Sequence, residues 1–394
     1  MKQKLLIIHN RLVIGGPALD TIPLAHHLED EFDIHILYGC KEKDETEPSF
    51  LLNKYPKLKL INIPHLKRKP DVVNDLKAYK FIQNHIRQYK PNIVHTHGAK
   101  VGLLGRLAAK RSGVKRIVHT FHGHLFHSYF NRFVSSLLVI LERKLTRYTD
   151  IIIAISRSQA EELSKLLRIS VADKLRIVPL GVDYIDPHLS DHYLQAFKRQ
   201  YQLEANTACI GLLGRMVSIK NPVFFLKVAQ YVLQTYNSTP VKFFIVGDGD
   251  ELPNMKQYLN SNNIAYSETQ ADKPIVFTSW VHNIQNILEG LDIVALTSFN
   301  EGTPLSLIEA QICGKPVVAV NVGGVKDTMI PNETGILIEH HNIKKFGDAL
   351  ILLIKDEVLR KEMGVKAKKF ATANFSKQKE AVLLRSIYLN KELN

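Results

Sequence analysis

Short runs of apolar residues recur along the first half of the chain and alternate with longer amphipathic stretches. The runs are rich in β-branched residues and end at Gly, Pro or Ser, which is typical of strands buried on both faces of a parallel sheet. The stretches between them, such as residues 78–90 and 157–167, have the spacing of amphipathic helices. The predicted strands of this first series are residues 4–9, 33–39, 58–64, 92–98, 116–123, 150–156 and 175–181.

The same alternation begins again after an irregular polar stretch at residues 182–193. Two series of strand–helix units predict an α/β protein with two doubly wound, Rossmann-like domains that face each other across a cleft. We place these domains at residues 1–190 and 191–375, with a C-terminal helix at 376–394 that could cross back to the first domain. The predicted strands of the second series are residues 208–214, 241–249, 274–281, 292–298, 315–320 and 335–338.

The cysteines, the apolar runs and the charge narrow the class of protein. Cys40, Cys209 and Cys313 are too scattered for a disulfide framework, which favours a reducing, cytoplasmic compartment. The run from Leu5 to Ile8 is too short for a secretory leader, and no run approaches the roughly 20 residues of a membrane span. The net charge is +14, and residues 1–190 carry 30 Lys and Arg against 18 Asp and Glu. This excess suggests an anionic partner, with ordinary solvated surface charge as the alternative.

Residues 300–310, NEGTPLSLIEA, predict a binding site at the start of a helix. Gly302 would make a turn after a strand, Pro304 suits a first helical turn, and Thr303 is the expected N-cap. The free amides of a helix start bind anions. Glu301 before the helix and Glu309 inside it would flank that anion, which suits a ligand with central phosphates and hydroxyls at both ends. An ordinary strand–turn–helix with surface glutamates is the alternative.

A second candidate site follows the predicted strand 208–214. Arg215 and Lys220 lie on the loop after it, and open α/β sheets bind ligands at the carboxyl ends of their strands. Arg can grip phosphate oxygens with two donors, and Lys adds a point charge. Gly15 and Gly16, between the first strand and the next helix, would let the backbone approach a ligand closely. Solvated loop charges and an ordinary turn are the alternatives.

Histidines crowd the end of the predicted strand 116–123. No cysteine or carboxylate lies near them and their spacing matches no standard zinc site, so metal binding is disfavoured. One of them could hydrogen-bond a sugar hydroxyl or assist proton transfer, whereas a structural role as a polar cap is the default for most. The residues are His119, His122, His124 and His127, with His95 and His97 at the end of the preceding strand.

Taken together, these motifs resemble those of the family-4 retaining glycosyltransferases, which have the two-domain GT-B fold. The resemblance covers nearly the whole chain, and the motifs are far more specific jointly than singly. They are Glu301-x7-Glu309 with Gly302, Pro304 and Ala310, then Gly314-x-Pro316-Val317-Val318 and Gly323-Gly324, and upstream Gly214-Arg215-x4-Lys220-Asn221 and Val246-Gly247-Asp248-Gly249.

The resemblance implies a role for each matching residue. Arg215 and Lys220 would hold the donor diphosphate and stabilise its departure, and Glu309 would hydrogen-bond the nucleotide's ribose. The other implied contacts are those of Glu301 with hydroxyls of the transferred sugar, of His122 with the sugar near its reacting carbon, of Gly15, Gly16, Gly302, Thr303, Pro304 and Leu305 with the diphosphate, and of Val281 with the base.

The resemblance also implies the chemistry. A sugar would leave a nucleoside diphosphate, UDP being favoured, and would retain its configuration through same-face attack in which the leaving phosphate oxygen accepts the acceptor's proton. No metal and no other cofactor are expected, because two cations and a helix start supply the positive charge. Departures from the family are Ser279 in place of a glycine near the base pocket, Thr297 where proline is common, and Gly123 after His122 where some members have aspartate.

The expected acceptor is a lipid-linked or cell-surface glycan intermediate of polysaccharide or glycolipid biosynthesis. The stretch 125–150 predicts an apolar, basic helix that would dock on the anionic inner face of the plasma membrane, with packing under the sheet as the alternative. No motif indicates nucleic-acid binding. The alternatives to a transferase are a nucleotide-sugar epimerase and a non-catalytic binder of nucleic acid or an anionic surface. The residues behind the membrane prediction are Phe126, Tyr129, Phe130, Phe133, Leu137, Leu138 and Leu141, with Arg132, Arg143, Lys144 and Arg147, extended by 67–69, 110–111 and 115–116.

Overall fold

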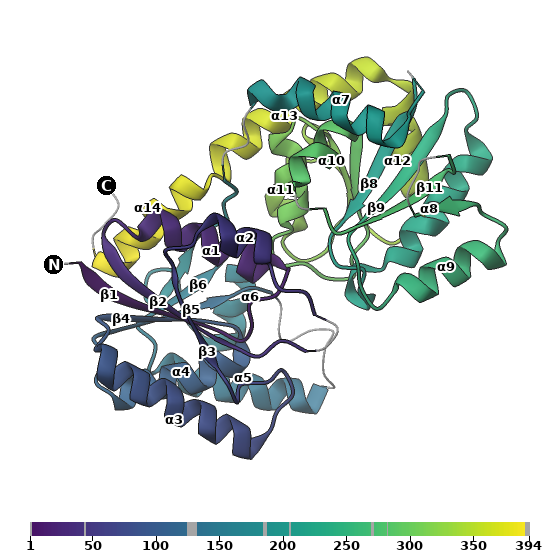
Figure 1. Ribbon diagram of the computed structural model, residues 1–394. Coiled ribbons are helices and arrows are strands. Elements are labelled where there is room, and N and C mark those ends of the chain that lie inside the picture. Colours follow the sequence, from purple (N-terminus) through teal and green to yellow (C-terminus); the bar gives the residue numbers. More distant parts are fainter. Residues whose placement is uncertain are drawn as a thin grey trace. The chain divides into compact units, whose positions relative to one another are not determined.

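The computed structural model describes residues 2–42, 45–123, 132–183, 187–204, 206–268, 272–281 and 283–390. The chain forms two compact units, which we call unit 1 (Met1–Asp183 with Ser376–Asn394) and unit 2 (Tyr184–Phe375). Each unit holds a seven-stranded sheet in which the paired strands run parallel (Figure 1). The predicted α/β class with two doubly wound sheets is therefore confirmed.

The sheet of unit 1 has the strand order β3-β2-β1-β4-β5-β6-β7. In the central strand β1, Leu5 pairs with Ile34 of β2 on one side and Ile93 of β4 on the other. The strands are β1 Gln3–His9, β2 Phe32–Gly39, β3 Lys59–Ile63, β4 Ile93–His97, β5 Arg116–Phe121, β6 Ile151–Ala154 and β7 Leu175–Ile177. The helices are α1 Gly16–Leu28, α2 Ser49–Lys54, α3 Val72–Tyr89, α4 Ala99–Arg111, α5 Arg132–Thr146, α6 Arg157–Leu167 and α14 Lys377–Leu389.

Helices cover both faces of this sheet, because successive residues of a strand point to opposite sides. Leu5 and Ile7 of β1 pack with α1 and α14, whereas Leu6 and Ile8 pack with α3 and α4. Helices from the two ends of the chain thus lie side by side over one face, as Figure 1 shows for α1 and α14. The strands read as continuous apolar runs because both of their faces are buried.

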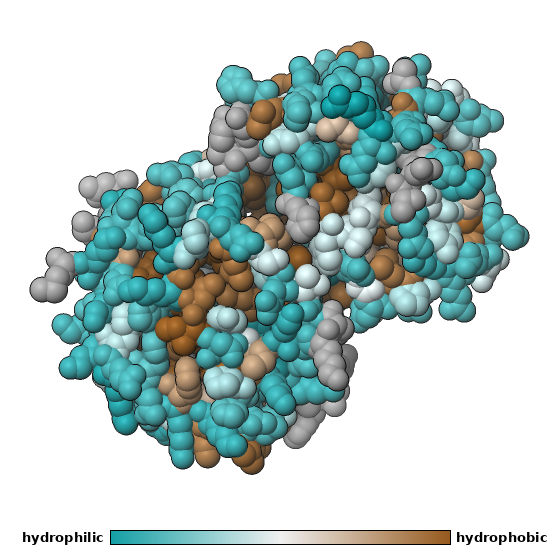
Figure 2. Space-filling model, in the orientation of Figure 1, coloured by the Kyte–Doolittle hydropathy of each residue, from teal (hydrophilic) through white to brown (hydrophobic). Residues whose placement is uncertain are grey.

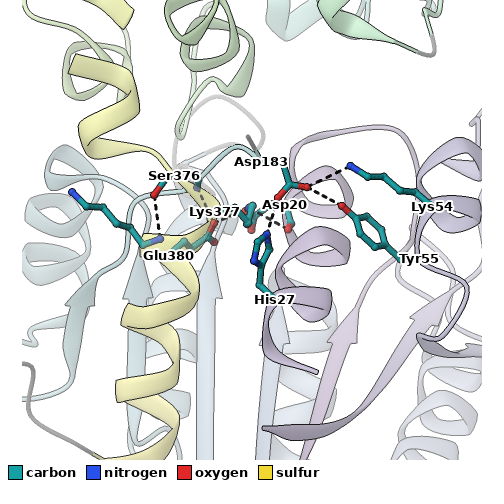
Figure 3. Close-up of polar contacts among 10 residues, drawn as sticks. Asp20, His27, Lys54, Tyr55, Asp183, Ser376, Lys377 and Glu380 are labelled. Atoms are coloured by element: carbon teal, nitrogen blue, oxygen red, sulfur yellow. Dashed lines mark hydrogen bonds and ion pairs between the residues drawn. The ribbon is translucent and has the colours of Figure 1, made fainter. Parts of the chain in front are cut away.

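Both segments that connect unit 1 to unit 2 are fastened within unit 1 (Figure 3). The Asp183 carboxylate lies 2.8 Å from Nε2 of His27 and accepts a hydrogen bond of 2.8 Å from the hydroxyl of Tyr55. Val182 pairs with Ser376, and the amide of Lys377 donates to the carbonyl of Val182 at 3.0 Å. The two connecting segments are therefore hydrogen-bonded to each other and lie beside α1.

The sheet of unit 2 has the order β10-β11-β9-β8-β12-β13-β14. Its strands are β8 Ala208–Leu213, β9 Val241–Val246, β10 Tyr266–Ser267, β11 Ile275–Ser279, β12 Ile293–Leu296, β13 Val317–Val320 and β14 Gly335–Ile338. Helices α8, α9 and α12 pack on one face, and α7, α10 and α11 on the other. The helices are α7 Ser190–Tyr201, α8 Pro222–Thr235, α9 Leu252–Ser261, α10 Ile284–Gly290, α11 Leu305–Ile312, α12 Ile343–Lys355 and α13 Glu357–Asn374, with short 3-10 turns η1 Pro187–Leu189, η2 Ser218–Lys220 and η3 Val325–Thr328.

The predicted elements differ from the observed ones mainly at their ends. Helix α3 begins at Val72 rather than at residue 78, because the Asp71 side chain caps it by accepting from the amide of Asn74. The two-residue strand β10 was not predicted, since two residues carry no periodic signal. His124, His127 and the aromatic residues 126–130 lie outside the described residues.

Candidate functional site

In unit 2, two loops with predicted site residues lie at one edge of the sheet, because β8 and β12 are neighbouring parallel strands. The loops are tied together by hydrogen bonds. The hydroxyl of Thr297 donates to the carbonyls of Lys220 and Asn221 at 3.1 and 3.3 Å, and the amide of Phe299 donates to the carbonyl of Ile219 at 2.8 Å. The backbone around Lys220 therefore cannot shift without shifting the loop that leads to Glu301.

Lys220 and Glu301 form an ion pair across these loops. Nζ of Lys220 lies 2.6 Å from Oε1 of Glu301, and the hydroxyl of Ser298 donates to the same oxygen at 2.5 Å. The two side chains are 23% and 11% exposed. A cation, a carboxylate and a hydroxyl thus meet at the carboxyl edge of the sheet, partly shielded from water but still reachable.

Gly323 and Gly324 hold the backbone of Glu301. Gly323 has a φ of +52°, and a Cβ added there would lie 2.0 Å from the carbonyl oxygen of Glu301. The amide of Gly324 donates to that same oxygen at 3.0 Å. A side chain at position 323 would therefore be strained by its backbone conformation and would also push Glu301 away.

Close backbone packing likewise positions the loop of Arg215. Gly247 has a φ of +130°, and a Cβ there would lie 1.9 Å from the carbonyl oxygen of Gly214. The amide of Met216 donates to the carbonyl of Asp248 at 2.9 Å. The side chain of Arg215 is exposed, and its guanidinium contacts no acidic group within the described part of the chain. Among the described residues, Lys220 has an acidic partner, whereas Arg215 has none.

Helix α11 begins one residue later than predicted. Pro304 is its N-cap, with extended backbone and no side-chain cap bond, and Leu305 is the first helical residue. The prediction that Thr303 caps the helix was wrong, because the chain stays extended through Pro304. The side chain of Thr303 is buried, and Gly302 and Glu309 are partly buried at the start and the middle of this segment.

Ser279 at the end of β11 has a φ of +56°, in the left-handed region. The family that the sequence resembles usually has glycine at this position, and the left-handed backbone gives the physical reason for that glycine. The carbonyl of Ser279 accepts from the amide of Gly247 at 2.9 Å. Trp280 follows, with a ring atom 3.4 Å from the position of an added Gly247 Cβ, and Val281 packs partly buried on the adjacent core.

In unit 1, the carboxyl ends of β1, β4 and β5 bring three histidines together. Nδ1 of His97 lies 2.7 Å from Nε2 of His122, and the His97 ring stacks on His9 with centroids 4.4 Å apart. Gly15 is the N-cap of α1, and Gly16 begins that helix with open space around its Cα. In unit 1 the predicted site residues thus lie at the start of α1 (Gly15 and Gly16) and in a group of mostly buried histidines (His122).

The remaining described histidines of this group have structural partners. His95 lies 2.6 Å from the hydroxyl of Tyr388 and 2.7 Å from that of Thr120, and His119 lies 2.8 Å from that of Thr96. Burial lowers the pKa of His95 to about 3, so it is neutral at physiological pH. Within the described residues, no group of three or more His, Cys, Asp or Glu side chains has a metal-binding arrangement.

Sequence reasoning missed several residues that shape the site. Thr297 looked harmless in place of a proline, yet its hydroxyl ties the two loops together. Ser298 and His341 carried no motif, although Nε2 of His341 lies 3.0 Å from the carbonyl oxygen of Thr297 and braces the same loop. The partners of Thr297 and His341 lie 77 and 44 positions away in the sequence, so no local signal could have identified these two residues.

Comparisons with known proteins agree with this architecture. A family model described as Glycosyltransferase Family 4 matches residues 14–184, and one described as Glycosyl transferases group 1 matches residues 207–356. A UDP-Gal:alpha-D-GlcNAc-diphosphoundecaprenol alpha-1,3-galactosyltransferase of Escherichia coli is 29% identical over 371 residues, covering 93% of this chain and 91% of the relative. A D-inositol 3-phosphate glycosyltransferase of Xylanimonas cellulosilytica is 26% identical over 313 residues, covering 75% and 71%.

Solved structures show the same fold. Sucrose-phosphate synthase from Thermosynechococcus elongatus superposes with a TM-score of 0.80 at 17% identity, covering 99% of both chains. Anabaena HepE in complex with UDP and glucose gives a TM-score of 0.78 at 18% identity, covering 98% of this chain and 99% of the other. With both sheets in the GT-B arrangement of strands and both family models matched, the chain belongs to the family-4 glycosyltransferases and is a glycosyltransferase.

Proposed function

We propose that this glycosyltransferase moves a sugar from a UDP-sugar to a lipid-linked acceptor, with retention of configuration and without a metal ion. The observation that carries the proposal is the cluster of Lys220, Glu301 and Ser298 beside the start of α11. It places a cation and a hydroxyl-binding carboxylate next to a helix start that favours anions. Family membership favours transfer over the epimerase and binding-module alternatives.

Each half of the cluster suits one half of a nucleotide sugar. Lys220 and the exposed Arg215 would neutralise the diphosphate, aided by amides at the start of α11. Glu301 would accept hydrogen bonds from hydroxyls of the transferred sugar, and Glu309 from the ribose. Lys220 is already 2.6 Å from Glu301, so the bound diphosphate would share this cation with the carboxylate. The ammonium group of Lys220 would then contact both the leaving diphosphate and the carboxylate that binds the sugar.

The transfer step balances without a protein nucleophile. The bond between the anomeric carbon and the β-phosphate oxygen breaks, and UDP leaves with the electron pair. The acceptor hydroxyl attacks the anomeric carbon from the same face, and its proton passes to the departing phosphate oxygen. Positive charge aimed at that oxygen stabilises the transition state in the way a metal does elsewhere.

The donor and acceptor classes rest on the relatives. The Escherichia coli relative is named for UDP-Gal and for a diphosphoundecaprenol-linked acceptor, and HepE was solved with UDP and glucose. A poly(ribitol-phosphate) alpha-N-acetylglucosaminyltransferase of Staphylococcus aureus is 32% identical over 168 residues, which cover 42% of this chain and 32% of the relative. Of these names, that of the Escherichia coli relative states a lipid-linked acceptor, which supports the proposed class and leaves the transferred sugar to experiment.

A surface of unit 1 supports peripheral contact with an anionic membrane. Leu137 and Ile140 of α5 are 51% and 49% exposed, and the exposed basic residues Lys144, on this helix, and Arg147, directly after it, follow them. No helix in the described ranges is both long and apolar enough to cross a bilayer. Exposed apolar residues flanked by lysines suit docking on the headgroups rather than insertion. Figure 2 shows that apolar areas interrupt the mostly hydrophilic surface of the face it displays.

The start of α3 is a second exposed apolar segment of unit 1 that follows basic residues. Val72, Val73 and Leu76 are 87%, 63% and 54% exposed and follow the exposed basic residues 67–69. Each basic side chain near an anionic leaflet contributes about 1 kcal/mol, so this set suffices for salt-sensitive docking.

One experiment tests the donor and the chemistry. The purified protein is incubated with a panel of UDP-, GDP- and ADP-sugars, and slow hydrolysis is measured with and without a polyprenyl-diphosphate sugar. We expect hydrolysis of a UDP-sugar only, acceleration by the lipid-linked acceptor, and an α-linked product from an α-linked donor. A product of inverted configuration, or a clear preference for GDP- or ADP-sugars, would overturn the proposal.

Co-sedimentation with vesicles tests the membrane half separately. Wild-type protein should pellet with vesicles of anionic phospholipid at low salt and stay in the supernatant with zwitterionic vesicles. Replacing Val72 and Val73 by Ser should weaken pelleting without changing hydrolysis of the soluble donor, and Val171→Ser, at an exposed valine elsewhere in unit 1, is the matched control. Failure of wild type to pellet would remove docking while leaving the transferase assignment intact.

A further inference from the structure

His97 lies at the centre of the buried histidine group of unit 1 and is 3% exposed. Its ring stacks on His9 with 17° between the planes, and its centroid lies 4.1 Å from that of His95. His95 is itself fixed by hydrogen bonds to two hydroxyls. The rings of His9 and His95 therefore restrict the plane of His97 independently of the hydrogen bond that it shares with His122.

That hydrogen bond joins a buried ring to one that is only partly buried. Nδ1 of His97 and Nε2 of His122 are 2.7 Å apart. Burial lowers the pKa of both rings, so both are neutral near pH 7 and one proton lies between them. Since Nε2 of His122 is engaged, only its Nδ1 remains for a ligand. This atom is buried and has no hydrogen-bond partner among the described residues.

The second nitrogen of His97 faces a different environment. Nε2 is buried and also has no partner within the described residues. His97 lines a cavity of about 10 Å³ together with Asp20 and Glu380. That volume is close to the minimum for one water molecule, and the lining offers the polar partners that a buried water needs.

The carboxylates at this cavity are held by a buried lysine (Figure 3). Nζ of Lys377 lies 2.5 Å from Oδ1 of Asp20 and 2.7 Å from Oε2 of Glu380, and all three side chains are 2% exposed. Oε2 of Glu380 also accepts from the amide of Gly181 at 2.8 Å. These contacts fix α14 against α1 and hold both carboxyl groups in place beside the cavity.

We propose that His97 is a positioning residue for sugar transfer. It holds the ring of His122 through one hydrogen bond, while a water molecule bound between Asp20 and Glu380 holds His97 from its other side. The inference rests on the proposed function together with the role that the family resemblance implies for His122, a hydrogen bond from its free Nδ1 to the transferred sugar. Asp20, Lys377 and Glu380 then act on that sugar through His97, without touching it.

Three substitutions of His97 separate positioning from a merely structural role. Asn places an amide near the position of Nδ1 and can either donate to or accept from His122, whereas Phe keeps the stacked ring without a polar atom. Gln places its amide near the position of Nε2. We expect His97→Phe and His97→Gln to lower kcat by about 10²-fold, the effect of a misplacement of about 1 Å, and His97→Asn to restore most of it.

The readouts exclude general damage to the protein. UDP affinity, followed by fluorescence of Trp280 in unit 2, should be the same in all three variants and wild type, and thermal unfolding identifies any variant that fails to fold. A His97→Phe variant that folds and turns over at the wild-type rate would overturn the proposal. Equal loss in the Asn and Phe variants would also overturn it, because a hydrogen bond at Nδ1 would then not be what matters.

Nuclear magnetic resonance of histidine labelled with ¹⁵N tests the contacts without activity. His97→Phe should shift the ring signals of His122, and Glu380→Gln, which keeps the size of the side chain, should shift those of His97. Burial and the charge of Asp20 raise the pKa of Glu380, and in Glu380→Gln the ammonium of Lys377 keeps its ion pair with Asp20, which favours folding of the variant. Unchanged His97 signals in Glu380→Gln would overturn the water link, and unchanged His122 signals in His97→Phe would overturn the positioning role.

The His122→Ala variant distinguishes this inference from the proposed function. If His122→Ala loses turnover but His97→Phe keeps the wild-type rate, positioning by His97 is refuted and the donor contact of His122 stands. A wild-type rate in His122→Ala would instead remove His122 from the donor site, and the inference would fail with that assignment. UDP-sugar hydrolysis by wild type tests the transferase assignment independently of both.

Discussion

Replacing Lys220 by Ala removes the cation that this structure places beside Glu301. The ammonium group lies 2.6 Å from Oε1 of Glu301, and the hydroxyl of Ser298 donates to the same oxygen. In Lys220→Ala the carboxylate of Glu301 keeps its hydrogen bond from Ser298 and the backbone carbonyl of Glu301 keeps its hydrogen bond from the amide of Gly324, so Glu301 is expected to stay in place. Lys220→Ala therefore tests the loss of positive charge without a change in the position of the Glu301 loop.

The role of Lys220 can be judged by comparing its effect on the free energy of unfolding with its effect on kcat. With side-chain exposures of 23% and 11%, the ion pair is partly solvated, and its loss should lower the free energy of unfolding by about 1 kcal/mol at most. Loss of a preorganised charge contact to the leaving diphosphate costs roughly 2.7–4 kcal/mol in the transition state, or about 10²- to 10³-fold in kcat. The effect on turnover should thus exceed the effect on stability severalfold.

The assay measures both quantities on the same variant. Turnover of the accepted UDP-sugar gives kcat, urea unfolding gives stability, and quenching of Trp280, the chain's only tryptophan, gives UDP affinity. Lys227→Ala is the matched control, because Lys227 is an exposed lysine on α8 with no ion pair in the described residues. The control should match wild type in all three measurements.

A Lys220→Ala enzyme with near-wild-type kcat would refute the assigned role. A kcat loss accompanied by an equal loss of stability would also count against it, since damage to the fold would then explain both. Arg215→Ala should lower kcat over the same range with almost no change in stability, because its guanidinium has no acidic partner within the described residues.

Four further predictions follow from the same contacts. Gly323→Ala should lower turnover at least 10-fold by displacing Glu301, whereas Gly113→Ala, also at positive φ but in open space, should cost only about 1–2 kcal/mol of stability; equal kcat in both variants would contradict this. Glu309→Gln should weaken UDP binding and Glu301→Gln should lower kcat and donor discrimination, and unchanged UDP affinity in Glu309→Gln would remove the ribose contact. Activity should survive EDTA, and complete loss restored by a divalent ion would show that a metal is required. Burial lowers the pKa of His35 to about 4, so the unfolded chain binds more protons and the free energy of unfolding should fall from about pH 6.5 towards pH 4; a urea series in which His35→Gln shows the same fall as wild type would exclude this cause.

Much of the fold followed from the sequence, because its signals are local. Strands buried on both faces read as continuous apolar runs, and Gly, Pro and Ser mark their ends. The runs 33–39 and 335–338 match β2 and β14 almost residue for residue. Once the strands were predicted, residues that directly follow a strand, such as Arg215 and His122, could be assigned to the carboxyl edge of a sheet, where ligands bind.

The sequence also identified residues for which only the structure explains why that residue type is needed. Gly323 belonged to a recognisable motif, but only the structure shows that a Cβ there would strike the backbone of Glu301. Ser279 was recognised as a departure from glycine, and its φ of +56° explains why glycine is usual there. Thr303 was assigned as a cap, because the sequence does not show that the chain stays extended through Pro304.

The sequence by itself determined the two series of strands and the family, and it supplied the loops at which we propose that the donor binds. Only the tertiary structure decided which side chains meet. Lys220 and Glu301 are 81 positions apart, and Lys377 reaches Asp20 across 357 positions. The hydrogen bond of His97 to His122 likewise depends on β4 and β5 being neighbours. Periodicity and turn chemistry act over a few residues, whereas strand order and register, set by burial of the whole sheet, bring such partners within hydrogen-bonding distance.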